Sequence, residues 1–353
     1  MLEPHKLKQY DIIIAGAGPV GAHLAYLLSK KGLSVLVLEK KRAPGKSACS
    51  GLISLRLKKL IPLDNSFVEH LIYGATFHSK NTYLTVEKKK PVAYVINRVL
   101  FDRHMIMLAE KTGAKIVLGE PFESYSIKEN RIVVNEKYRA EMLVGADGAA
   151  SAVRRLSGLK GKLCLINGII SIFSEPSIYR TVDVFYGKSI APGFFAWRIP
   201  RGKSIEYGLA SNKNHIAYFE KFLKQHNRML GKYYTHPIVF GQTETVGDRV
   251  ILVGDAALQV KPFSGGGVIY GLMCAKIADK AITNAFKKDD FSKAFFEKNY
   301  DGLWKEKLME PIKNGKLVRE MLNSLDDEEL DAFFELAAKR KDDIGSFGDM
   351  DFL

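Results

Sequence analysis

Glycines and carboxylates stand at the ends of apolar runs in three separate parts of the chain. The first is Gly16-Ala17-Gly18-Pro19-Val20-Gly21, which follows the apolar run 10–15. In such a motif the first glycine permits a tight turn, the second lets the backbone approach a pyrophosphate, and the third lets a helix pack closely on the strand. The unpaired N–H groups at the start of that helix attract phosphate oxygens. This spacing therefore indicates the binding of a dinucleotide.

An acidic side chain follows where a ribose hydroxyl needs an acceptor. The second apolar run, 34–38, is followed by Glu39, at about the 20-residue separation expected from the glycines. A carboxylate accepts a hydrogen bond from a free ribose hydroxyl and repels a 2′-phosphate, so Glu39 favours FAD or NAD over NADP. Lys40 comes next and keeps the local field positive. Because only one such fingerprint is present, we do not expect a second dinucleotide-binding fold.

Two further motifs place a glycine and an aspartate at the end of an apolar run. Asp147 and Gly148 follow the run that ends at Val144, and Gly254 and Asp255 follow the run 250–253. In an open α/β sheet, ligands bind at the carboxyl ends of the strands. We therefore expect all three motifs to meet along one extended cofactor.

The spacing of apolar residues along the chain predicts the helices and strands that position these residues. Helices are predicted over 20–31, 98–112, 214–227 and 266–286, with a short helix-like stretch at 52–60 and a charged, helical surface tail from Phe291 onward. Strands are predicted over 73–78, 83–87, 92–96, 115–118, 124–127, 131–135, 168–173, 181–186, 194–198 and 204–210.

These elements predict an α/β fold with a Rossmann-type FAD-binding domain, an inserted antiparallel β-rich cap domain and a short helical C-terminal region. The FAD-binding domain is assigned to 1–70, 97–160 and 241–290. The cap, which would cover the reactive end of the cofactor, is assigned to 71–96 and 161–240, and the C-terminal region to 291–353.

Composition narrows the choice of partners. The 353 residues include 46% hydrophobic residues, enough for a sizeable core, and carry a formal net charge of +14. Such a charge favours a nucleotide, a phospholipid head group or an anionic membrane face, although a merely solvated basic surface has the same composition. We recognise no nucleic-acid-binding motif and expect no nucleic-acid partner.

Processing signals and cysteine usage suggest where the protein works. We find no secretory signal, no apolar run long enough to span a bilayer and no metal-ligand spacing. The three cysteines, Cys49, Cys164 and Cys274, form no close pair. These features predict a cytoplasmic protein, peripheral at the membrane if the basic surface is used there.

Together the motifs resemble the glutathione-reductase-type FAD proteins with the para-hydroxybenzoate hydroxylase fold, over about residues 8–290. The resemblance rests on the glycine triplet, on Gly145-Ala146-Asp147-Gly148-x-x-Ser151-x-x-Arg154 and on Gly254-Asp255. It implies FAD as cofactor, with Asp255 on the ribityl chain. The segment Asn97-Arg98-x-x-Phe101-Asp102 also matches, which implies that Arg98 lies near the FAD phosphates.

Within that group the chain most resembles the geranylgeranyl reductase family. Pro44-Gly45-Lys46-Ser47-Ala48-Cys49-Ser50-Gly51 resembles the family's loop near the flavin ring. Phe195-Ala196-Trp197-Arg198-Ile199-Pro200, followed by Gly208-Leu209-Ala210, resembles its substrate segment Tyr-x-Trp-x-Phe-Pro…Gly-x-Gly. Three positions depart from that pattern: Phe195 replaces Tyr, Ile199 replaces Phe and Ala210 replaces the second Gly. The substrate-binding candidates are Phe195, Trp197, Pro200 and Gly208.

The resemblance implies an FAD-dependent reductase of isoprenoid carbon–carbon double bonds, acting on membrane lipid precursors of archaeal type. The electron donor is NADPH or a protein such as ferredoxin. Cys49 is the candidate catalytic residue, as a proton donor or alkene-positioning group; alternatively it is a small residue that fills space beside the flavin. The cofactor-binding candidates are Gly16, Gly18, Pro19, Val20, Gly21, Glu39, Lys40, Cys49, Ser50, Gly51, Arg98, Asp147, Gly148, Gly254, Asp255, Gly265, Gly266, Gly267 and Val268.

Two other functions remain open from the sequence. One is a flavin monooxygenase of the same fold, because the Asp147-Gly148 segment also occurs in hydroxylases. The other is a flavin- or lipid-binding protein without turnover.

Overall fold

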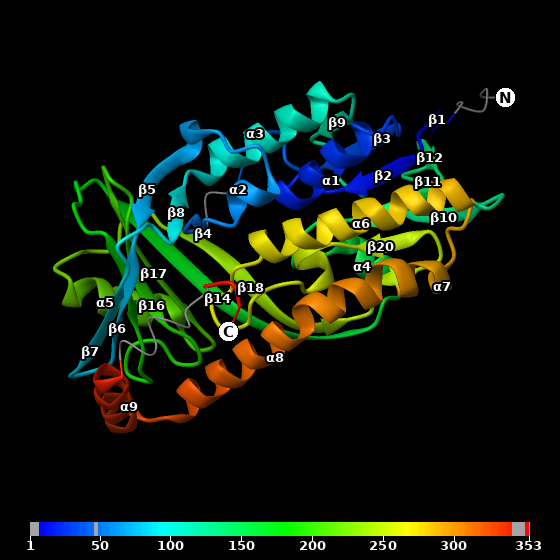
Figure 1. Ribbon diagram of the computed structural model, residues 1–353. Helices are drawn as coiled ribbons and strands as arrows, with labels where there is room; N and C mark the ends of the chain where they lie inside the picture. Colours follow the sequence, from blue (N-terminus) through cyan, green and yellow to red (C-terminus); the bar gives the residue numbers. More distant parts are fainter. Residues whose placement is uncertain (1–6, 46–48, 341–349, 353) are drawn as a thin grey trace.

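A six-stranded, mainly parallel sheet carries the three glycine and carboxylate motifs (Figure 1). The computed structural model describes residues 7–45, 49–340 and 350–352. The strand order is β19 (Val246–Gly247), β20 (Val250–Leu252), β13 (Met142–Gly145), β2 (Ile12–Ala15), β3 (Val35–Glu39) and β9 (Lys115–Leu118). Because β20, β13, β2 and β3 run in parallel, their carboxyl ends share one edge of the sheet.

Both faces of this sheet are covered, as the unbroken apolar strands require. Successive side chains of a strand point to opposite faces. Ile12 and Ile14 pack among helices on one face, and Ile13 packs against a small sheet on the other. The helices are α1 (Pro19–Ser29), α3 (Arg98–Lys111) and α6 (Val268–Lys288). The small sheet has the order β1 (Lys8–Gln9), β12 (Tyr138–Ala140), β11 (Arg131–Val134) and β10 (Tyr125–Lys128).

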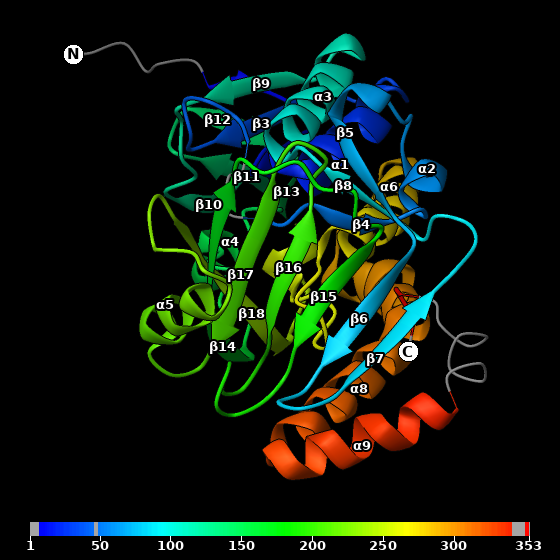
Figure 2. The same cartoon turned by 90° about the vertical axis from the view of Figure 1, so that its left-hand side faces the viewer.

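A seven-stranded cap sheet forms the second layer, with α5 (His215–Gln225) lying across β14 and β17 (Figure 2). Its order is β18 (Tyr234–Thr243), β14 (Gly161–Phe173), β17 (Ile205–Ser211), β16 (Ala196–Pro200), β15 (Thr181–Phe185), β6 (Gly74–His78) and β7 (Tyr83–Glu87). The predicted antiparallel pairing needs one correction, because β15 pairs in parallel with β6. These two strands lie about a hundred positions apart in the chain, so no tight turn obliges them to run in opposite directions.

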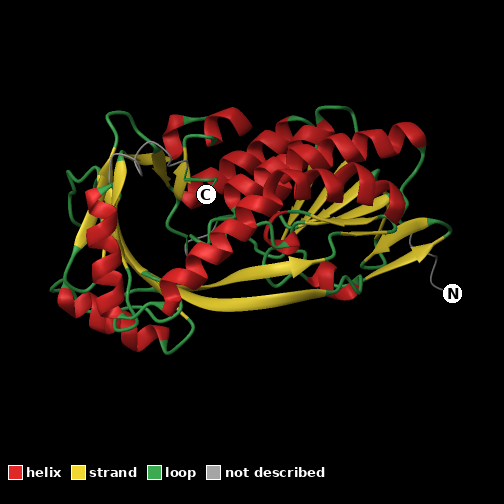
Figure 3. Cartoon of the chain, turned by 60° about the horizontal axis from the view of Figure 1, so that its bottom comes forward, coloured by secondary structure: helices red, strands yellow, loops and turns green. Residues whose placement is uncertain are grey.

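The longest strand, β14, joins the two layers (Figure 3). It pairs with β18 continuously, from Gly161 opposite Thr243 to Ile170 opposite Tyr234. The sequence predicted only the second half of β14 and did not predict β18. The first five residues of β14 are exposed, so their side chains lack the alternation between polar and apolar that marks a half-buried strand.

A third, three-stranded sheet connects the two larger sheets. Its order is β4 (Leu52–Ser54), β8 (Ala93–Ile96) and β5 (Val68–Ile72), beside the one-turn helices α2 (Leu57–Leu60) and η1 (Asn65–Phe67). The predicted helix over 52–60 is therefore wrong in its first half, and β5 was not predicted. Pairing of Leu52 with Val95 draws the segment into the sheet, and this long-range contact overrides local propensity.

The C-terminal helices cross from one layer to the other (Figure 1). They are α7 (Lys293–Phe296), the π-helical turn η3 (Glu297–Asp301), α8 (Gly302–Ser324) and α9 (Asp327–Lys339). The tail is helical as predicted, but it is not confined to the surface, because Phe296, Tyr300 and Trp304 are buried. Among the described residues, no helix combines the length and the apolar composition needed to cross a bilayer.

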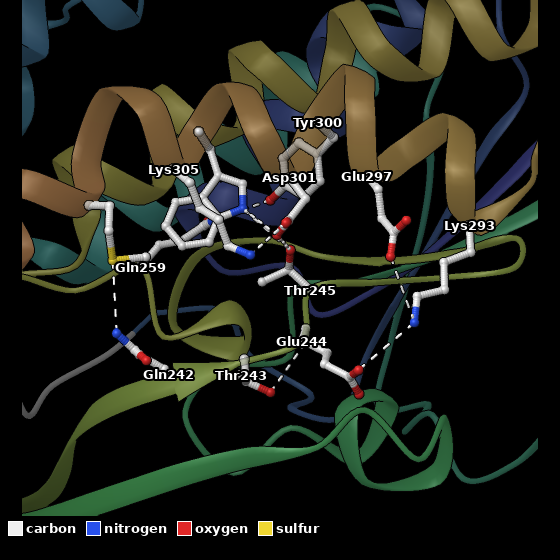
Figure 4. Close-up of polar contacts among 12 residues, drawn as sticks. Gln242, Thr243, Glu244, Thr245, Gln259, Lys293, Glu297, Tyr300, Asp301 and Lys305 are labelled. Carbon is white, nitrogen blue, oxygen red and sulfur yellow. Dashed lines mark hydrogen bonds and ion pairs between the residues drawn. The ribbon is translucent and has the colours of Figure 1, made fainter.

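The junction between this tail and the nucleotide sheet is polar as well as apolar (Figure 4). Thr245 donates to Asp301 at 2.5 Å, and the Trp304 indole N–H donates to Asp301 at 3.2 Å. Lys305 makes an ion pair with the same carboxylate at 2.6 Å. Asp301 is thus fixed by three donors, and it anchors the start of α8 to the strand connection before β20.

One buried histidine makes stability depend on pH. His23 of α1 is 1% exposed, and neither ring nitrogen has a partner among the described residues. Burial, with a smaller contribution from Lys276, lowers the pKa of His23 to about 4. Between pH 6.5 and 4 this ring is protonated in the unfolded chain but neutral in the native protein. The free energy of unfolding therefore falls as the pH drops from 6.5 to 4.

We expect His23→Leu to remove this loss, which is worth about 3 kcal/mol for a shift of that size. The check is urea unfolding at a series of pH values between 4 and 7. The variant should retain the dependence due to His226, whose pKa is also lowered to about 4 by burial and Arg198. Identical pH dependence in the variant and the parent protein would contradict the assignment.

Candidate active site

The first glycine turn packs directly on the second motif. Gly16 has a φ of +99°, and a Cβ atom built on it lies 2.5 Å from the Ala146 carbonyl oxygen. A Cβ on Gly21 lies 2.0 Å from the Gly16 carbonyl oxygen. By contrast, a Cβ on Gly18 has no described atom within 4 Å. Gly16 and Gly21 are thus required by packing, whereas Gly18 leaves open space for a ligand.

Helix α1 begins at Pro19, where a missing N–H costs nothing. Val20, the next residue, contacts the third motif: a Cβ on Gly254 lies 3.2 Å from a Val20 methyl carbon, and a Cβ on Gly271 of α6 lies 2.5 Å from it. Glycine at both positions lets α1, α6 and the turn after β20 approach one another closely.

Glu39 lies against the glycine turn, as its spacing predicted. One carboxylate oxygen accepts from the Ala17 N–H and the other from the Lys41 N–H, each at 2.9 Å. Each oxygen can accept a second hydrogen bond, so a ribose hydroxyl remains compatible with this arrangement. Lys40 is exposed beside it.

In the second motif, one carboxylate oxygen of Asp147 accepts no hydrogen bond from any described residue. One oxygen of Asp147 accepts from the N–H groups of Ala152 and Val153, at 2.6 and 3.1 Å, at the start of α4 (Ala152–Leu156). The other oxygen is buried and has no donor among the described residues. A Cβ on Gly148, whose φ is +83°, meets nothing within 4 Å. A ligand that brings hydroxyl or amide donors to this edge suits both features.

The third motif is braced from behind by the C-terminal tail. The Gly254 N–H donates to the Gln259 side chain at 2.8 Å, and Gln259 donates to the Tyr300 hydroxyl at 2.9 Å. Tyr300 in turn donates to the Leu252 carbonyl at 2.6 Å, so the chain of hydrogen bonds begins and ends next to the same turn. Figure 4 shows Gln259 and Tyr300 at this junction. The turn it holds, η2 (Gly254–Ala257), carries Asp255.

We expect Tyr300→Phe to cost about 1–3 kcal/mol of stability, because it leaves a buried carbonyl and a buried amide without their partner. FAD should also dissociate faster, since the turn that carries Asp255 loses its brace. Thermal unfolding with and without excess FAD measures both effects. Tyr83→Phe is the matched control, because Tyr83 is 65% exposed. A Tyr300→Phe protein as stable as the control would refute the brace.

The glycine run before α6 adjoins Asp255 on one side and the cap on the other. A Cβ on Gly267 lies 2.2 Å from an Asp255 carboxylate oxygen. A Cβ on Gly265 lies 3.0 Å from Ile238 and 3.7 Å from the ring of Phe194. Gly266 lies against Lys261, and Val268 is the first residue of α6. This run therefore bridges the nucleotide edge and an apolar part of the cap.

That part of the cap is an aromatic wall, which we define as Phe194, Phe195 and Trp197. The rings of Phe194 and Phe195 stack with centroids 4.2 Å apart, and Phe195 meets Trp197 at 5.8 Å. A Cβ on Gly208 lies 2.1 Å from the Trp197 indole, so only glycine allows the ring to lie across β17. Pro200 is buried at the end of β16. Trp197 and Gly208, two residues of the predicted substrate segment, thus form one packing unit.

Cys49 is next to Arg98. An Nη atom of Arg98 lies 2.9 Å from Cys49 Sγ, and the rest of the guanidinium is held by Asp102 at 3.0 and 3.1 Å. Burial alone lowers the pKa of Arg98, but the negative charges that Cys49 and Asp102 can carry outweigh it and raise that pKa. The guanidinium is therefore always charged, and it lies in direct contact with the sulfur. Lys46, Ser47 and Ala48 of the same loop lie outside the described residues.

The predicted place of Arg98 near the FAD phosphates remains a prediction, and the structure adds its contact with the thiol. Sequence reasoning missed Gln259, Tyr300, Arg201 and Glu206, which support the site from behind. The sequence offers a local signal only for Gln259, which follows the Gly254-Asp255 motif closely in the chain.

Known proteins resemble this chain along most of its length. The family described as "FAD binding domain" matches residues 9–183 of this chain. Digeranylgeranylglycerophospholipid reductase 1 of Methanococcoides burtonii is 30% identical over 92% of this chain and 86% of its own length. Digeranylgeranylglycerophospholipid reductase of Methanocaldococcus jannaschii is 29% identical over 95% of this chain and 92% of its own length.

Solved structures give the same result. A geranylgeranyl bacteriochlorophyll reductase-like protein of Thermoplasma acidophilum superimposes with a TM-score of 0.86 at 26% identity, over 95% of this chain and 92% of that one. The p-nitrophenol 4-monooxygenase of Pseudomonas putida superimposes with a TM-score of 0.76 at 16% identity, over 95% and 96%, which shows a shared fold alone.

The dinucleotide edge, the open glycines and these matches define an FAD-dependent oxidoreductase with a Rossmann-type domain and a β-rich cap, which confirms the predicted fold class and cofactor. More particularly, the chain belongs to the geranylgeranyl reductase family, together with the digeranylgeranylglycerophospholipid reductases.

Proposed function

We propose that this protein reduces isolated carbon–carbon double bonds in isoprenoid chains of membrane lipid precursors. The observation that carries the proposal is the proximity of the Gly265–Gly267 run to the aromatic wall, because an apolar surface beside the proposed cofactor-binding edge suits an isoprenoid chain. The names of the relatives support the choice of a geranylgeranyl-type lipid as substrate.

The cofactor-binding residues are those named from the sequence, and their arrangement supports that assignment. Gly18 and Gly148 border open space, Glu39 lies at the glycine turn, and Asp147 and Asp255 present carboxylates along one edge. Bound FAD, once reduced, supplies a hydride to the substrate. The N-terminus of α6, preceded by glycines, favours negative charge at this end of the site. We also retain the predicted domain boundaries as a proposal.

Reduction of an alkene breaks one carbon–carbon π bond and forms two C–H bonds, one from a hydride and one from a proton. We assign the proton to the Cys49 thiol, whose sulfur is left negative when the S–H bond breaks. Arg98, 2.9 Å away, stabilises that charge. The aromatic wall keeps water from the reacting carbons and holds the chain in reach, which matters because an isolated alkene is a poor electrophile.

The test is a single anaerobic turnover. The FAD-loaded protein is reduced with dithionite, a geranylgeranyl lipid is added, and flavin absorbance and product mass are followed. Reoxidation of the flavin, with two mass units gained per double bond, is the expected result. A product that gains oxygen only when air is admitted identifies a monooxygenase instead. Lipid that stays bound and unchanged identifies a carrier, and either outcome overturns the proposal.

The electron donor in the cell is NADPH or a reduced protein such as ferredoxin. Substituting each for dithionite in the same assay shows which one reduces the flavin at a rate that matches turnover.

Peripheral contact with an anionic membrane also belongs to the proposal. Ile178 is 92% exposed and Met229 is 83% exposed, in two loops that Arg228 joins by pairing with Glu175 and lying over the ring of Phe173. Exposed apolar side chains beside basic ones, in a chain of net charge +14, suit an anionic lipid surface.

We expect the double variant Ile178→Asp, Met229→Asp to lose flotation with vesicles containing phosphatidylglycerol. Leu336→Asp, an exposed position on α9, is the control and should float as the parent protein does. Equal flotation of both variants would remove this surface from the proposal.

A further inference from the structure

One buried guanidinium holds the two segments that carry Cys49 and Arg98. An Nη atom of Arg201 donates to the Ser50 carbonyl at 2.6 Å, and its other Nη donates to the Ile96 carbonyl at 3.1 Å. Ser50 directly follows Cys49, and Ile96 lies two residues before Arg98. The Arg201 guanidinium thus holds the backbone at both Ser50 and Ile96. Cys49 and Arg98, which contact each other, lie next to these two positions in the chain.

Arg201 is itself fixed by two carboxylates. It pairs with Glu206 at 2.9 Å and with Glu69 at 2.7 Å, and its side chain is 7% exposed. Glu206 is fully buried, and its other oxygen accepts from the Trp197 indole N–H at 2.9 Å. The aromatic wall and the Cys49 loop therefore rest on one buried ion pair.

Glu69 extends the same network to the start of α3. Its second oxygen accepts from the Asn97 side-chain amide at 2.9 Å. The Asn97 side-chain oxygen, Oδ1, caps α3 by accepting from the N–H groups of Val99 and Leu100, each at 3.1 Å. The orientation of the first turn of α3, which includes Arg98, is thus tied to Arg201 by a second route.

We propose that Arg201 is a positioning residue that keeps the Arg98 guanidinium against the Cys49 sulfur. A guanidinium suits this task because its fork of donors serves two carbonyls and two carboxylates at once, which a single ammonium group cannot do. The inference rests on the proposed function only for the use made of the thiol. The arrangement itself is tested without substrate.

The simpler alternative is that Arg201 only neutralises the buried Glu206. The two readings differ in what they predict for the thiol. If Arg201 is a counter-ion and nothing more, a lysine in its place keeps the charge and leaves the surroundings of Cys49 unchanged. If it positions the loop, lysine loses the carbonyl contacts, and Arg98 and Cys49 separate.

The charge selectivity of Cys49 alkylation measures their proximity. Iodoacetate is negatively charged and iodoacetamide is neutral. A nearby guanidinium therefore raises the rate of alkylation by iodoacetate relative to the rate with iodoacetamide. General loosening of the fold raises both rates and leaves their ratio unchanged. The FAD-loaded protein is treated with each reagent, and labelled peptides are quantified by mass spectrometry. Cys164, which is exposed, serves as the reference thiol in the same sample, whereas Cys274 is buried.

We expect Arg201→Lys to lower the iodoacetate-to-iodoacetamide ratio at Cys49 about five-fold, the factor that one contact between unit charges at about 4 Å supplies in water. Arg98→Met defines the ratio without the guanidinium. Arg198→Lys is the matched control, because Arg198 lies on β16, shortly before Arg201 in the chain, and pairs with Asp183 instead. Arg198→Lys should therefore keep the parental ratio at Cys49. No variant should change the ratio at Cys164, the reference thiol.

A second variant guards against a folding defect. Arg201→Gln alone leaves Glu206 buried without a counter-ion, so it is combined with Glu206→Gln, which removes both charges. The double variant should show the same fall in the ratio. A parental ratio in Arg201→Lys and in the double variant overturns the positioning role, and it does so whether or not the protein reduces lipids. Conversely, a fallen ratio in a protein without reductase activity upholds the positioning role and rejects only the proposed function.

Discussion

Gly18→Ala is expected to yield a folded protein that has lost most of its FAD. A Cβ at this position meets no described atom within 4 Å, so the apo fold gains no clash. The methyl group instead occupies the space that the pyrophosphate needs. A methyl group forced into a close contact costs about 1–3 kcal/mol, or roughly 10- to 100-fold in affinity.

The measurement is titration of apoprotein with FAD, together with thermal unfolding of both apoproteins. Gly231→Ala is the control, because its Cβ also meets nothing within 4 Å and it lies in the loop after α5, away from the nucleotide edge. If Gly18→Ala binds FAD as tightly as this control does, the pyrophosphate does not lie at the turn. A large fall in the unfolding temperature of the apoprotein would show that the open space is needed for folding.

Gly208→Ala is expected to lower reductase activity at least about ten-fold while FAD stays bound, since overpacking at a contact this short costs more than 1 kcal/mol. The added Cβ would lie 2.1 Å from the Trp197 indole, so the ring must turn away and lose its hydrogen bond to Glu206. Because the aromatic wall then changes shape, the lipid is held less well beside the cofactor.

Single-turnover reduction of a geranylgeranyl lipid and the flavin absorbance of the purified protein measure the two parts of this prediction. Ala210→Gly is the matched control on the same strand. It restores the family's second glycine and removes one methyl group that packs in the same cluster as the wall, so it should lower stability by about 1 kcal/mol without a clash that displaces the Trp197 ring. Full activity in Gly208→Ala would separate Trp197 from substrate binding.

Local chemistry explains which parts of this molecule were predictable. The turn 16–21 and the acid Glu39 were predicted because each glycine and the carboxylate act within a short stretch of chain, and Glu39 does lie on the Ala17 N–H. The substrate segment supplied Trp197 and Gly208 as candidates by their spacing alone, and the structure adds the packing of one against the other. In these cases one residue type has one mechanical reason to stand where it does.

The parts that escaped prediction depend on contacts between distant segments. Leu52 joins a strand because Val95 is opposite it, and nothing within the stretch 52–60 encodes that partner. Arg201 lies about 150 positions from Ser50, and an arginine just past the end of a strand usually has a solvent-facing side chain. Its buried role follows only from Glu206 and the two carbonyls around it.

The unbroken ladder between β14 and β18 has a mechanical consequence for access to the site. Two strands hydrogen-bonded along ten facing positions act as a stiff beam, because a hinge would need several of those bonds to break together. We therefore expect the cap sheet to keep its position relative to the nucleotide sheet. If a long lipid chain is the substrate, its entry and release would then depend on movements of side chains and short loops rather than on a hinge between the two sheets.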